Sequence, residues 1–337
     1  MPTHRVSPEH PDPGIIQEAA ALLRRGHLVA FPTETVYGLG AHAMDPQAVA
    51  RIYAAKGRPA WNPLIVHVAT ADDVHAVAAS WPEMARQLAE AFWPGPLTLV
   101  VPKRPDVPDS VTAGLPTVAL RVPAHPVAQA LLVAAAIPVA APSANPSMAL
   151  SPTRASHVAR AFGDQVAMIL DGGPTMVGIE STVVDVTGER PRLLRPGGIA
   201  PHVIEQVVGR LAVPDAAPTA DAARSSPGMM ERHYAPRARL LVFQAGSESA
   251  ARQAMDDERH RGGVPGAVIW SDASAAGIPA SGIVVRLPRG AAEYARRLYE
   301  TLHGMDDQGC TLIALEAPPD EPGWEGVSDR VRRAATP

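Results

Sequence analysis

Hydroxyl groups, glycines and cations are concentrated in three nearby segments of the chain. Residues 31–40 read F-P-T-E-T-V-Y-G-L-G, and they are followed by K-G-R-P at 56–59 and by N-P-L-I-V-H at 62–67. Glycines let backbone approach a ligand closely, and lysine and arginine bind phosphate oxygens in different geometries. These side chains flank two predicted strands, so the pattern is typical of a polyanion site rather than of a hydrophobic core.

Lysine usage supports this interpretation. Lys56 and Lys103 are the only lysines among 30 basic residues. Lys56 stands two residues before Arg58, and an ammonium group beside a guanidinium group suits phosphate oxygens. Lys103 lies in a Pro-Lys-Arg-Pro turn and shows the alternative, a solvated loop lysine. We expect Lys56 to be a ligand-binding residue.

Later segments place further polar side chains in or beside predicted strands. Arg121 lies inside an apolar strand, so its burial requires either a bound anion or a structural Asp or Glu partner. P-S-A-N at 142–145 could bind a ribose or form an ordinary Asx or Ser turn. Ser181 begins a strand and Arg195 ends another before two glycines, and a structural role is open for each. His67 could equally be a core or rim histidine.

Composition narrows the class of protein. The chain has 337 residues, a net charge of −4 and a pI near 6.3, which argues against a broad basic surface for nonspecific nucleic-acid binding. Its single cysteine, Cys310, excludes a disulfide framework within one chain and is expected to be a buried strand residue. The sequence shows no signal peptide or membrane-spanning stretch, and we expect a soluble cytoplasmic protein.

Residues 1–210 alternate short apolar runs with helical patterns, which predicts a mixed, twisted α/β sheet. Helices are expected at 13–25, 46–55, 82–92, 126–135 and 153–162. Strands are expected at 28–31, 64–68, 97–101, 118–122, 139–141, 167–170, 182–186 and 192–194. No P-loop, zincin, C-x-x-C or G-x-S-x-G pattern occurs, so those enzyme classes lose their usual support.

The remaining chain divides into two parts. Residues 211–238 read as a linker, but S-P-G-M-M-E-R-H-Y-A-P at 226–236 is rich in special side chains, and we expect this linker to act as a lid over the site. Residues 239–337 predict a small parallel Rossmann-like α/β domain, with strands at 238–243, 267–270, 283–286 and 311–315 and a helix at 291–303. No dinucleotide fingerprint follows its first strand.

Taken together, these segments resemble the threonylcarbamoyl-AMP synthase family in its long form, with an N-terminal YrdC-like domain. P-T-E-T-V-Y-G-L-G, K-G-R-P-x-x-N-P-L, L-R-V-P, P-S-A-N, S-T-V-V-D, L-R-P-G and S-P-G-M…R-H-Y-A-P occur in family order. The resemblance implies synthesis of L-threonylcarbamoyladenylate and pyrophosphate from ATP, L-threonine and bicarbonate, with Mg²⁺ accompanying ATP. It further implies that a separate tRNA threonylcarbamoyl transferase complex receives the product, so stable nucleic-acid binding is not expected.

The same resemblance assigns roles to residues. It implies catalytic roles at the phosphates for Lys56 and Arg58, and no metal-binding side chain is assigned. The implied L-threonine-binding residues are Thr35, His67, Arg121, Ala141 through its backbone, and Ser181. The implied ATP-binding residues are Arg58, Asn62, Thr117, Ser143, Ser151, Arg195 and Tyr234.

Two positions depart from the family pattern, and two other functions remain open. Met148 stands where the family usually has glycine, and Met230-Glu231 stand where a basic and an aromatic residue are common. Met148 adopts a positive φ less readily than glycine, which puts the course of residues 147–151 in question. A noncatalytic RNA-binding module of the same fold is one alternative. A carbamoyl-transfer maturation factor is another, although one cysteine cannot supply the zinc modules of such proteins.

Overall fold

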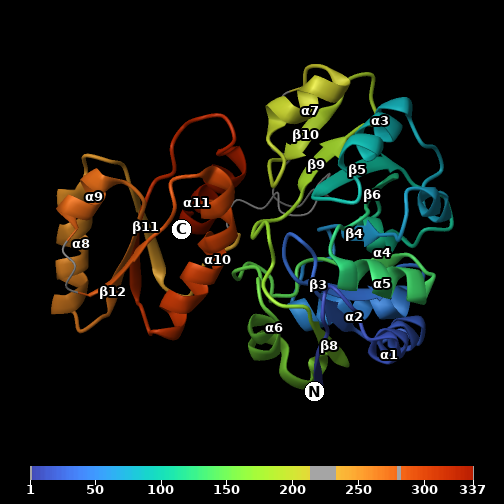
Figure 1. Ribbon diagram of the computed structural model, residues 1–337, viewed down its shortest axis with the longest axis horizontal. Helices are drawn as coiled ribbons and strands as arrows, with labels where there is room; N and C mark the ends of the chain where they lie inside the picture. Colours follow the sequence, from blue (N-terminus) through green and yellow to red (C-terminus); the bar gives the residue numbers. More distant parts are fainter. Residues whose placement is uncertain (1, 213–232, 279–281, 337) are drawn as a thin grey trace.

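The computed structural model describes residues 2–212, 233–278 and 282–336. These residues form two α/β domains that lie side by side (Figure 1). The N-terminal domain is drawn from blue to yellow and the C-terminal domain in orange and red. The prediction of a mixed sheet followed by a small parallel sheet is confirmed.

The described strands of the N-terminal domain form one large sheet. They are β1 (Thr3–Arg5), β2 (Val29–Phe31), β3 (Gly38–His42), β4 (Ile65–His67), β5 (Leu97–Pro102), β6 (Thr117–Arg121), β7 (Val139–Ala140), β8 (Met168–Asp171), β9 (Thr182–Asp185) and β10 (Arg192–Arg195). Their order is β1-β8-β2-β3-β7-β4-β6-β5-β9-β10. Parallel pairs such as β4 with β6 alternate with antiparallel pairs such as β2 with β3.

Helices cover this sheet. They are α1 (Pro13–Arg24), α2 (Pro46–Lys56), α3 (Glu83–Phe92), α4 (Asp109–Thr112), α5 (Pro126–Ala135), α6 (Ala155–Phe162) and α7 (Pro201–Val208), with 3₁₀ turns at Asp72–Ala76 and Gly163–Gln165. The apolar faces of α1 and α5 pack together with residues of β2 and β8 in one buried cluster. A second cluster includes residues of α2, α3 and α6 against other sheet residues, so the sheet is buried between helical layers.

The C-terminal domain is a parallel four-stranded sheet among the described residues. Its strands are β11 (Arg239–Phe243), β12 (Pro265–Ile269), β13 (Ile283–Arg286) and β14 (Leu312–Glu316), in the order β11-β14-β12-β13. Its helices are α8 (Glu248–His260), α9 (Asp272–Gly277), α10 (Ala291–Asp307) and α11 (Glu325–Ala335). In Figure 1, α8 and α9 cover the outer face of the sheet, while α10 and α11 lie between the sheet and the N-terminal domain.

Several details differ from the sequence prediction. Among the central strands, β3 is not predicted, because G-L-G-A-H at 38–42 lacks the β-branched residues that favour strands. Its pairing with β2 and β7 makes it a strand nevertheless. Cys310 is buried as expected but lies two residues before β14 rather than within it. Most of the predicted linker, residues 213–232, lies outside the described residues, so the boundaries at 211 and 238 stay a prediction.

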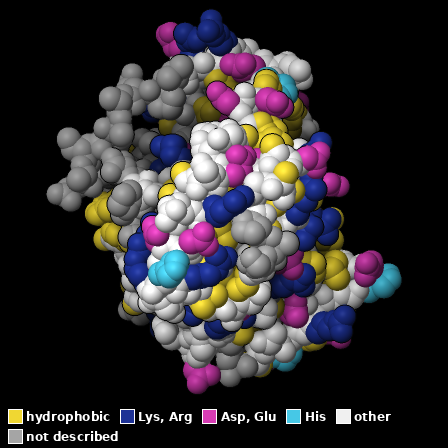
Figure 2. All heavy atoms as spheres, turned by 90° about the vertical axis from the view of Figure 1, so that its left-hand side faces the viewer, with side chains coloured by type: hydrophobic (Ala, Val, Ile, Leu, Met, Phe, Trp, Pro, Cys, Tyr) yellow, Lys and Arg dark blue, Asp and Glu magenta, His cyan; other side chains and the backbone are white. Residues whose placement is uncertain are grey.

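The described residues include no helix that combines the length and the apolar character needed to cross a bilayer. The outer face of the C-terminal domain, seen in Figure 2, mixes basic and acidic side chains rather than gathering one sign of charge. Ion pairs on α8 and near α9 account for part of this pattern, including those of Arg259 with Asp256 and of Arg261 with Glu258.

Apolar packing joins the two domains. One buried cluster combines Val36, Leu150 and Ile179 of the N-terminal domain with Leu298 of α10 and Val331 of α11. Burial of such side chains stabilises the contact by about 25 cal/mol for each Å² of apolar surface removed from water. The relative position of the domains is therefore held by a shared hydrophobic core.

Two glycines allow the helices to approach closely. A Cβ atom at Gly178 would lie 2.4 Å from the Cα of Arg296, and one at Gly326 would lie 2.6 Å from the carbonyl oxygen of Gly197. Real Cβ atoms do not tolerate such contacts with backbone. Glycine at both positions lets α10 and α11 pack directly on loops of the N-terminal domain.

A stacked histidine pair also spans the junction. The ring centroids of His157 in α6 and His303 in α10 are 3.8 Å apart. The Nδ1 of His157 accepts a hydrogen bond from the Thr153 N–H, and burial, followed by the neighbouring His303 and Arg160, lowers the pKa of His157 to about 3. Asp307 opposes this shift and Arg154 adds to it. His157 is therefore neutral in the folded protein.

We predict that His157 makes the protein less stable as the pH falls. Between its ordinary pKa of 6.5 and its folded pKa of about 3, the unfolded chain binds one proton more than the folded chain. Stability should therefore decrease by about 1.4 kcal/mol per pH unit from this group below pH 6.5. The substitution His157→Phe keeps a ring for stacking and should flatten the pH dependence of the free energy of unfolding, measured by urea denaturation. The exposed His10→Gln variant is the control, and an unchanged slope in His157→Phe would contradict the prediction.

Candidate active site

A narrow cavity lies between the central strands of the N-terminal domain and the chain leading to the C-terminal domain. It has a volume of about 50 Å³, enough for a few water molecules. Most predicted site residues line it, namely Thr35, Arg58, His67, Arg121, Ala141, Ser143, Ser181, Arg195 and Tyr234. The structure thus brings together segments that are up to 199 residues apart in the sequence.

Arg121 and His67 form one wall of the cavity. They are directly opposite each other in the parallel register of β4 and β6, so both side chains project from the same face of the sheet. The Nε of Arg121 donates to the Gly95 carbonyl and its Nη2 donates to Glu34 at 2.7 Å. The carboxylate partner that the sequence leaves open is therefore Glu34.

This ion pair leaves part of the guanidinium group available. Glu34 uses its second oxygen to accept the Ala124 N–H at 3.0 Å, and the Arg121 side chain is only 4% exposed. No described residue accepts a hydrogen bond from the Nη1 of Arg121. Because Arg121 lines the cavity, this nitrogen can bind the carboxylate of a ligand.

His67 is a neutral neighbour of this cation. Burial, and then the nearby Arg121, lowers the pKa of His67 to about 3. Its Nδ1 is buried without a hydrogen-bond partner among the described residues, and its ring meets the edge of Phe31 at 6.2 Å between centroids. His67 therefore combines core packing with a position in the wall of the cavity.

Helix α2 positions the next group of site residues. The Asp45 side chain caps its first turn by accepting the Gln47 N–H, and Gly57 ends the helix in the left-handed conformation with φ of 58°. The turn directs Arg58 back over its own loop, where Nη2 donates to the Asn62 side chain at 2.6 Å and to the Pro63 carbonyl at 2.7 Å. Asn62 thus holds Arg58 in the cavity wall rather than lining the cavity itself.

Lys56 supports the P-S-A-N loop. It is 3% exposed, and its Nζ donates to the carbonyl oxygens of Ser143, at 2.5 Å, and of Asn145. Its own carbonyl accepts the Ser147 N–H at 2.8 Å. Lys56 does not line the cavity, so a contact with phosphates stays a prediction.

Arg195 and Ser181 form the opposite wall. The Nε and Nη2 of Arg195 donate to the Ser181 carbonyl, and Nη2 also donates to the Ser181 hydroxyl at 3.1 Å. A register shift between β9 and β10 at Leu193 and Arg195 re-aims the end of the strand. The Thr98 hydroxyl lies 2.7 Å from the Ser181 hydroxyl and completes this group.

Two predicted ATP-binding residues lie away from the cavity. Thr117 is at the opposite end of β6 from Arg121, a separation of about 13 Å along the strand. Ser151 is fully buried, and its hydroxyl donates to a carboxylate oxygen of Glu180. The roles of both residues in nucleotide binding stay predictions.

Three residues that line the cavity or hold its walls are not predicted from the sequence. Glu34 pairs with Arg121, and Glu180 and His233 line the cavity. Each lies inside a motif that was recognised for its hydroxyls or its tyrosine. The arginines in apolar segments were the available signal for the two glutamates, because buried guanidinium groups require carboxylate partners.

The linker enters the cavity at its C-terminal end. Tyr234 is 1% exposed and has a left-handed backbone with φ of 62°, and the His233 ring meets it in a T-shaped arrangement with 3.9 Å between ring centroids. Burial, followed by the nearby Arg58 and Lys56, lowers the pKa of His233 well below its ordinary value. These two rings fill space beside four cationic side chains, those of Lys56, Arg58, Arg195 and Arg330. A strained tyrosine backbone is typical of a functional position.

The described residues contain no cluster of three or more His, Cys, Asp or Glu side chains that could hold a metal ion. Glu34 and Glu180, the carboxylates at the cavity, are already engaged by arginines. Mg²⁺ prefers one or two free carboxylates together with substrate phosphates. These side chains therefore do not fit a resident magnesium site.

Comparison with known proteins agrees with this arrangement. Residues 21–197 match the family model described as "Telomere recombination", and residues 199–336 match the "Threonylcarbamoyl-AMP synthase, C-terminal domain" model. The chain is 44% identical to the threonylcarbamoyl-AMP synthase of Pyrococcus abyssi, covering 95% of this chain and 94% of the relative, and 43% identical to that of Bacillus subtilis, covering 96% and 93%. The crystal structure of P. abyssi Sua5 complexed with L-threonine superposes with a TM-score of 0.92 at 41% identity, covering 99% and 98% of the two chains.

Met148, the first departure from the family pattern, keeps the backbone conformation that favours glycine. Its φ is 71°, and its side chain is 37% exposed. The Met148 carbonyl accepts the Ala235 N–H at 3.0 Å, which connects this loop to the residue after Tyr234. The second departure, Met230-Glu231, lies outside the described residues.

We predict that Met148→Gly stabilises the protein. A left-handed conformation disfavours an L-residue by roughly 1–2 kcal/mol, and the greater freedom of glycine in the unfolded chain offsets roughly 0.5–1 kcal/mol of the gain. The net increase in the free energy of unfolding should be about 0.5 kcal/mol relative to Met148→Ala, which keeps the unfavourable backbone. Urea denaturation of the two variants measures the difference. A less stable glycine variant would show that the side chain, not the backbone, dominates at this position.

Proposed function

The chain belongs to the threonylcarbamoyl-AMP synthase family, and we propose that its cavity is where ATP, L-threonine and bicarbonate form L-threonylcarbamoyladenylate and pyrophosphate. The observation that carries this proposal is the pairing of Arg121 with His67 across from Arg58 and Arg195. On the amino-acid side, one guanidinium nitrogen without a partner among the described residues and a neutral imidazole line the same cavity. Two further buried guanidinium groups, those of Arg58 and Arg195, line the same cavity on the side proposed for the polyphosphate.

L-Threonine is proposed to bind at the Arg121 wall. Its carboxylate would accept hydrogen bonds from Nη1 of Arg121. The neutral His67 would accept a hydrogen bond from the substrate without adding positive charge beside the arginine. Thr35 and Ser181 supply hydroxyl groups within the same cavity, and Ala141 contributes its backbone. The related P. abyssi protein has been crystallised in complex with L-threonine, which supports the proposal that this chain binds the same amino acid.

The proposed chemistry needs no protein nucleophile. The amine of threonine attacks the carbon of bicarbonate, and loss of water leaves an anionic carbamate. A carbamate oxygen then attacks the α-phosphorus of ATP, and the bond between the α-phosphorus and the bridging oxygen breaks to release pyrophosphate. Positioning the three substrates is the main task of the site, and such positioning can be worth about 7–11 kcal/mol.

The charges of the walls suit this transfer. Arg58 is held by hydrogen bonds to its own loop and Arg195 by hydrogen bonds to Ser181, so their positions are set before the substrate arrives. Ser143 also lines the cavity. Asn62, Thr117, Ser151 and Lys56 are proposed to act on the nucleotide side, with Lys56 supporting the P-S-A-N loop. Mg²⁺ is proposed to arrive with ATP as part of the substrate.

The cavity must enlarge to admit these substrates. Sites for small molecules have volumes of about 300–1,000 Å³, much larger than the free volume here. Tyr234 and His233 occupy the adjoining space, so we propose that they withdraw to admit ATP and return to exclude water from the carbamate and the mixed anhydride. Tyr234 thus acts as a lid and contacts the nucleotide when it closes.

The proposed product serves a tRNA-modifying transferase complex in the cytoplasm. This chain itself is not proposed to bind nucleic acid stably, and the mixed charges of its outer face in Figure 2 agree with that. Pyrophosphate release measured with MgATP, threonine and bicarbonate, together with mass analysis of the nucleotide product, tests the function. Steeply salt-dependent tRNA binding without threonine-dependent pyrophosphate release would favour the RNA-binding alternative instead.

We predict that Arg121→Lys weakens the use of threonine. The lysine keeps the positive charge beside Glu34 but cannot bind both Glu34 and a substrate carboxylate through a planar fork. The KM for threonine should rise by about 10-fold or more, since a hydrogen bond to a charged group contributes about 1.5–3 kcal/mol. The KM for ATP should change little.

Glu34→Gln is the matched variant for this measurement. It removes the ion pair but keeps the guanidinium group, so threonine should still bind within a few-fold of the parent. An unchanged KM for threonine in folded Arg121→Lys protein would remove Arg121 from the amino-acid site.

A further inference from the structure

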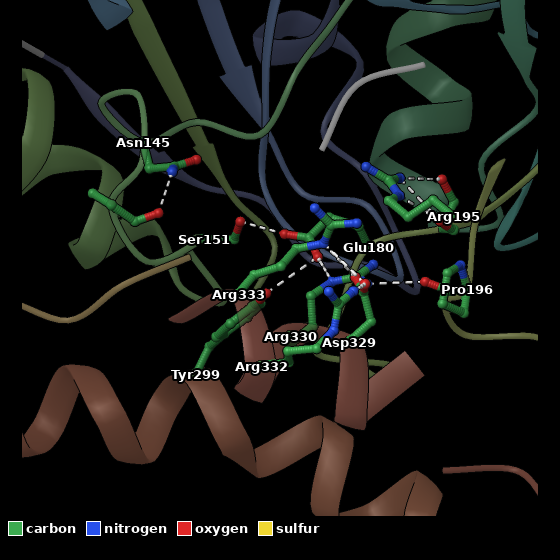
Figure 3. Close-up of polar contacts among 12 residues, drawn as sticks. Asn145, Ser151, Glu180, Arg195, Pro196, Tyr299, Asp329, Arg330, Arg332 and Arg333 are labelled. Carbon is green, nitrogen blue, oxygen red and sulfur yellow. Dashed lines mark hydrogen bonds and ion pairs between the residues drawn. The ribbon is translucent and has the colours of Figure 1, made fainter. Parts of the chain in front are cut away.

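The C-terminal domain places one buried cation against the walls of the cavity. Arg330 of α11 has a fully buried side chain. Its Nε donates to Glu180 at 2.6 Å, and its Nη1 donates to the Pro196 carbonyl at 2.9 Å (Figure 3). Both contacts cross from the C-terminal to the N-terminal domain. Nη1 also donates to the neighbouring Asp329 at 2.8 Å.

Each partner of Arg330 in the N-terminal domain belongs to a segment of the cavity wall. Glu180 lines the cavity and precedes Ser181, while Pro196 follows Arg195. Arg195 itself is bonded to Ser181, so Arg330 closes a ring of contacts that includes both segments. A shift of Arg330 would therefore move the nucleotide-side wall as a unit.

Glu180 extends the network to the P-S-A-N side. Its Oε1 accepts the Ser151 hydroxyl, and its Oε2 accepts the Tyr299 hydroxyl at 3.2 Å as well as the Nε of Arg330. Figure 3 shows Ser151, Tyr299 and Arg330 converging on this carboxylate from different elements. The carbonyl of Ser151 is also contacted by the Nε2 of His303 at 3.1 Å. Three side chains of the C-terminal domain thus hold the Glu180 and Ser151 pair.

The same guanidinium group contacts the lid. Its central carbon lies 5.0 Å from the centre of the Tyr234 ring, within the range of a cation–π interaction. The Nη2 of Arg330 is buried without a hydrogen-bond partner among the described residues. Arg330 therefore leaves one buried N–H group without a hydrogen bond while it contacts the cavity wall and the lid, an arrangement that stability alone does not favour.

The charge balance explains why an arginine is needed here. Burial opposes ionisation of Glu180, but Arg330 and Arg195, with the Ser151 hydroxyl, outweigh it and keep the pKa of Glu180 below its ordinary value. Without Arg330, the buried carboxylate would lose its nearest counter-charge and would protonate more readily. A protonated Glu180 would hold Ser151 less firmly, because the carboxyl oxygen that accepts the Ser151 hydroxyl would no longer be a charged acceptor.

We infer that Arg330 of the C-terminal domain is a positioning residue for the reaction in the N-terminal cavity. It sets the nucleotide-side wall through Glu180 and Pro196 and sets the closed position of Tyr234 through its guanidinium face. This inference rests on the proposed function. It gives the C-terminal domain a role at the active site, since Arg330 is anchored in α11, more than 130 residues from the wall segments that it holds.

The test compares Arg330→Gln and Arg330→Lys with Arg332→Gln. Arg332 lies on the same helix, is mostly exposed and pairs with the same Asp329 at 2.7 Å. In full-length protein, kcat/KM for ATP should fall by about 100-fold in Arg330→Gln, the loss expected when reacting groups move by about 1 Å. Arg330→Lys keeps the charge but not the fork and should lose less. Arg332→Gln should match the parent.

Two further readouts separate positioning from a general loss of stability. The dissociation constant for threonine, measured by calorimetry without ATP, should change much less than kcat/KM for ATP in both Arg330 variants, because Ser181 is the one residue proposed for threonine binding that belongs to the network. The acidic limb of the pH dependence of kcat should move to higher pH in Arg330→Gln, because Glu180 loses its counter-charge. In Glu180→Gln/Arg330→Gln, which removes both charges, that shift should disappear.

Each outcome has one meaning. If the parent and Arg332→Gln release no threonine-dependent pyrophosphate, the proposed function fails. If the parent is active and Arg330→Gln keeps its kcat/KM for ATP, the inference is wrong. A uniform loss of active protein, with unchanged KM values and an unmoved pH profile, would also overturn it in favour of a purely structural role. Should Arg330→Gln fail to fold, the same criteria apply to Arg330→Lys and to the charge-balanced double variant.

Discussion

The constraint on which the structure depends is the burial of several cations around one small cavity. A buried guanidinium or ammonium group is very unfavourable unless carboxylates or carbonyl oxygens accept its N–H groups. The cations concerned are Lys56, Arg58, Arg121, Arg195 and Arg330. Each is bonded within the described residues to backbone carbonyls, to a carboxylate or to both. The loops of the site are therefore folded so that their carbonyl and carboxylate oxygens reach these cations.

The number of carboxylates near the cavity is smaller than the number of cations, and this imbalance has a functional meaning. Glu34 serves Arg121 and Glu180 serves Arg330, while Arg58 and Lys56 are held by neutral oxygens. Neutral partners fix a cation in place without cancelling its charge. The cavity therefore keeps a positive potential that an anionic substrate can neutralise.

The sequence predicted those parts of the site that are local. The motif around Arg58 ends a helix and returns through Asn62, and Arg121 stands alone in an apolar strand, so residue type and spacing were sufficient for both. The strand β3 was missed because small residues hide its character until the neighbouring strands pair with it. The strand that carries Arg121 can thus be predicted from its local sequence pattern, whereas β3 is a strand only because it pairs with its neighbours.

The burial of Arg330 and its contact with Glu180 could not be predicted from the sequence. The residues 329–333 read D-R-V-R-R, which on a helix is usually a solvated run of charges. An arginine in this run is buried only if it lies on the face of α11 that meets the N-terminal domain. No local signal in the sequence specifies that face. The partner, Glu180, lies 150 residues earlier.

At the domain junction, one set of contacts holds the two domains together and another set orients the cavity wall. A shared apolar cluster already holds α10 and α11 against the N-terminal domain. Replacing a buried ion pair by apolar groups of similar volume is often neutral or stabilising, so the Arg330 and Glu180 pair is not needed for cohesion. An apolar contact tolerates small rotations, whereas the hydrogen bonds of a guanidinium group fix both distance and angle. The polar network at this junction therefore serves to orient the cavity wall, and the hydrophobic core around it keeps the domains together while that orientation is maintained.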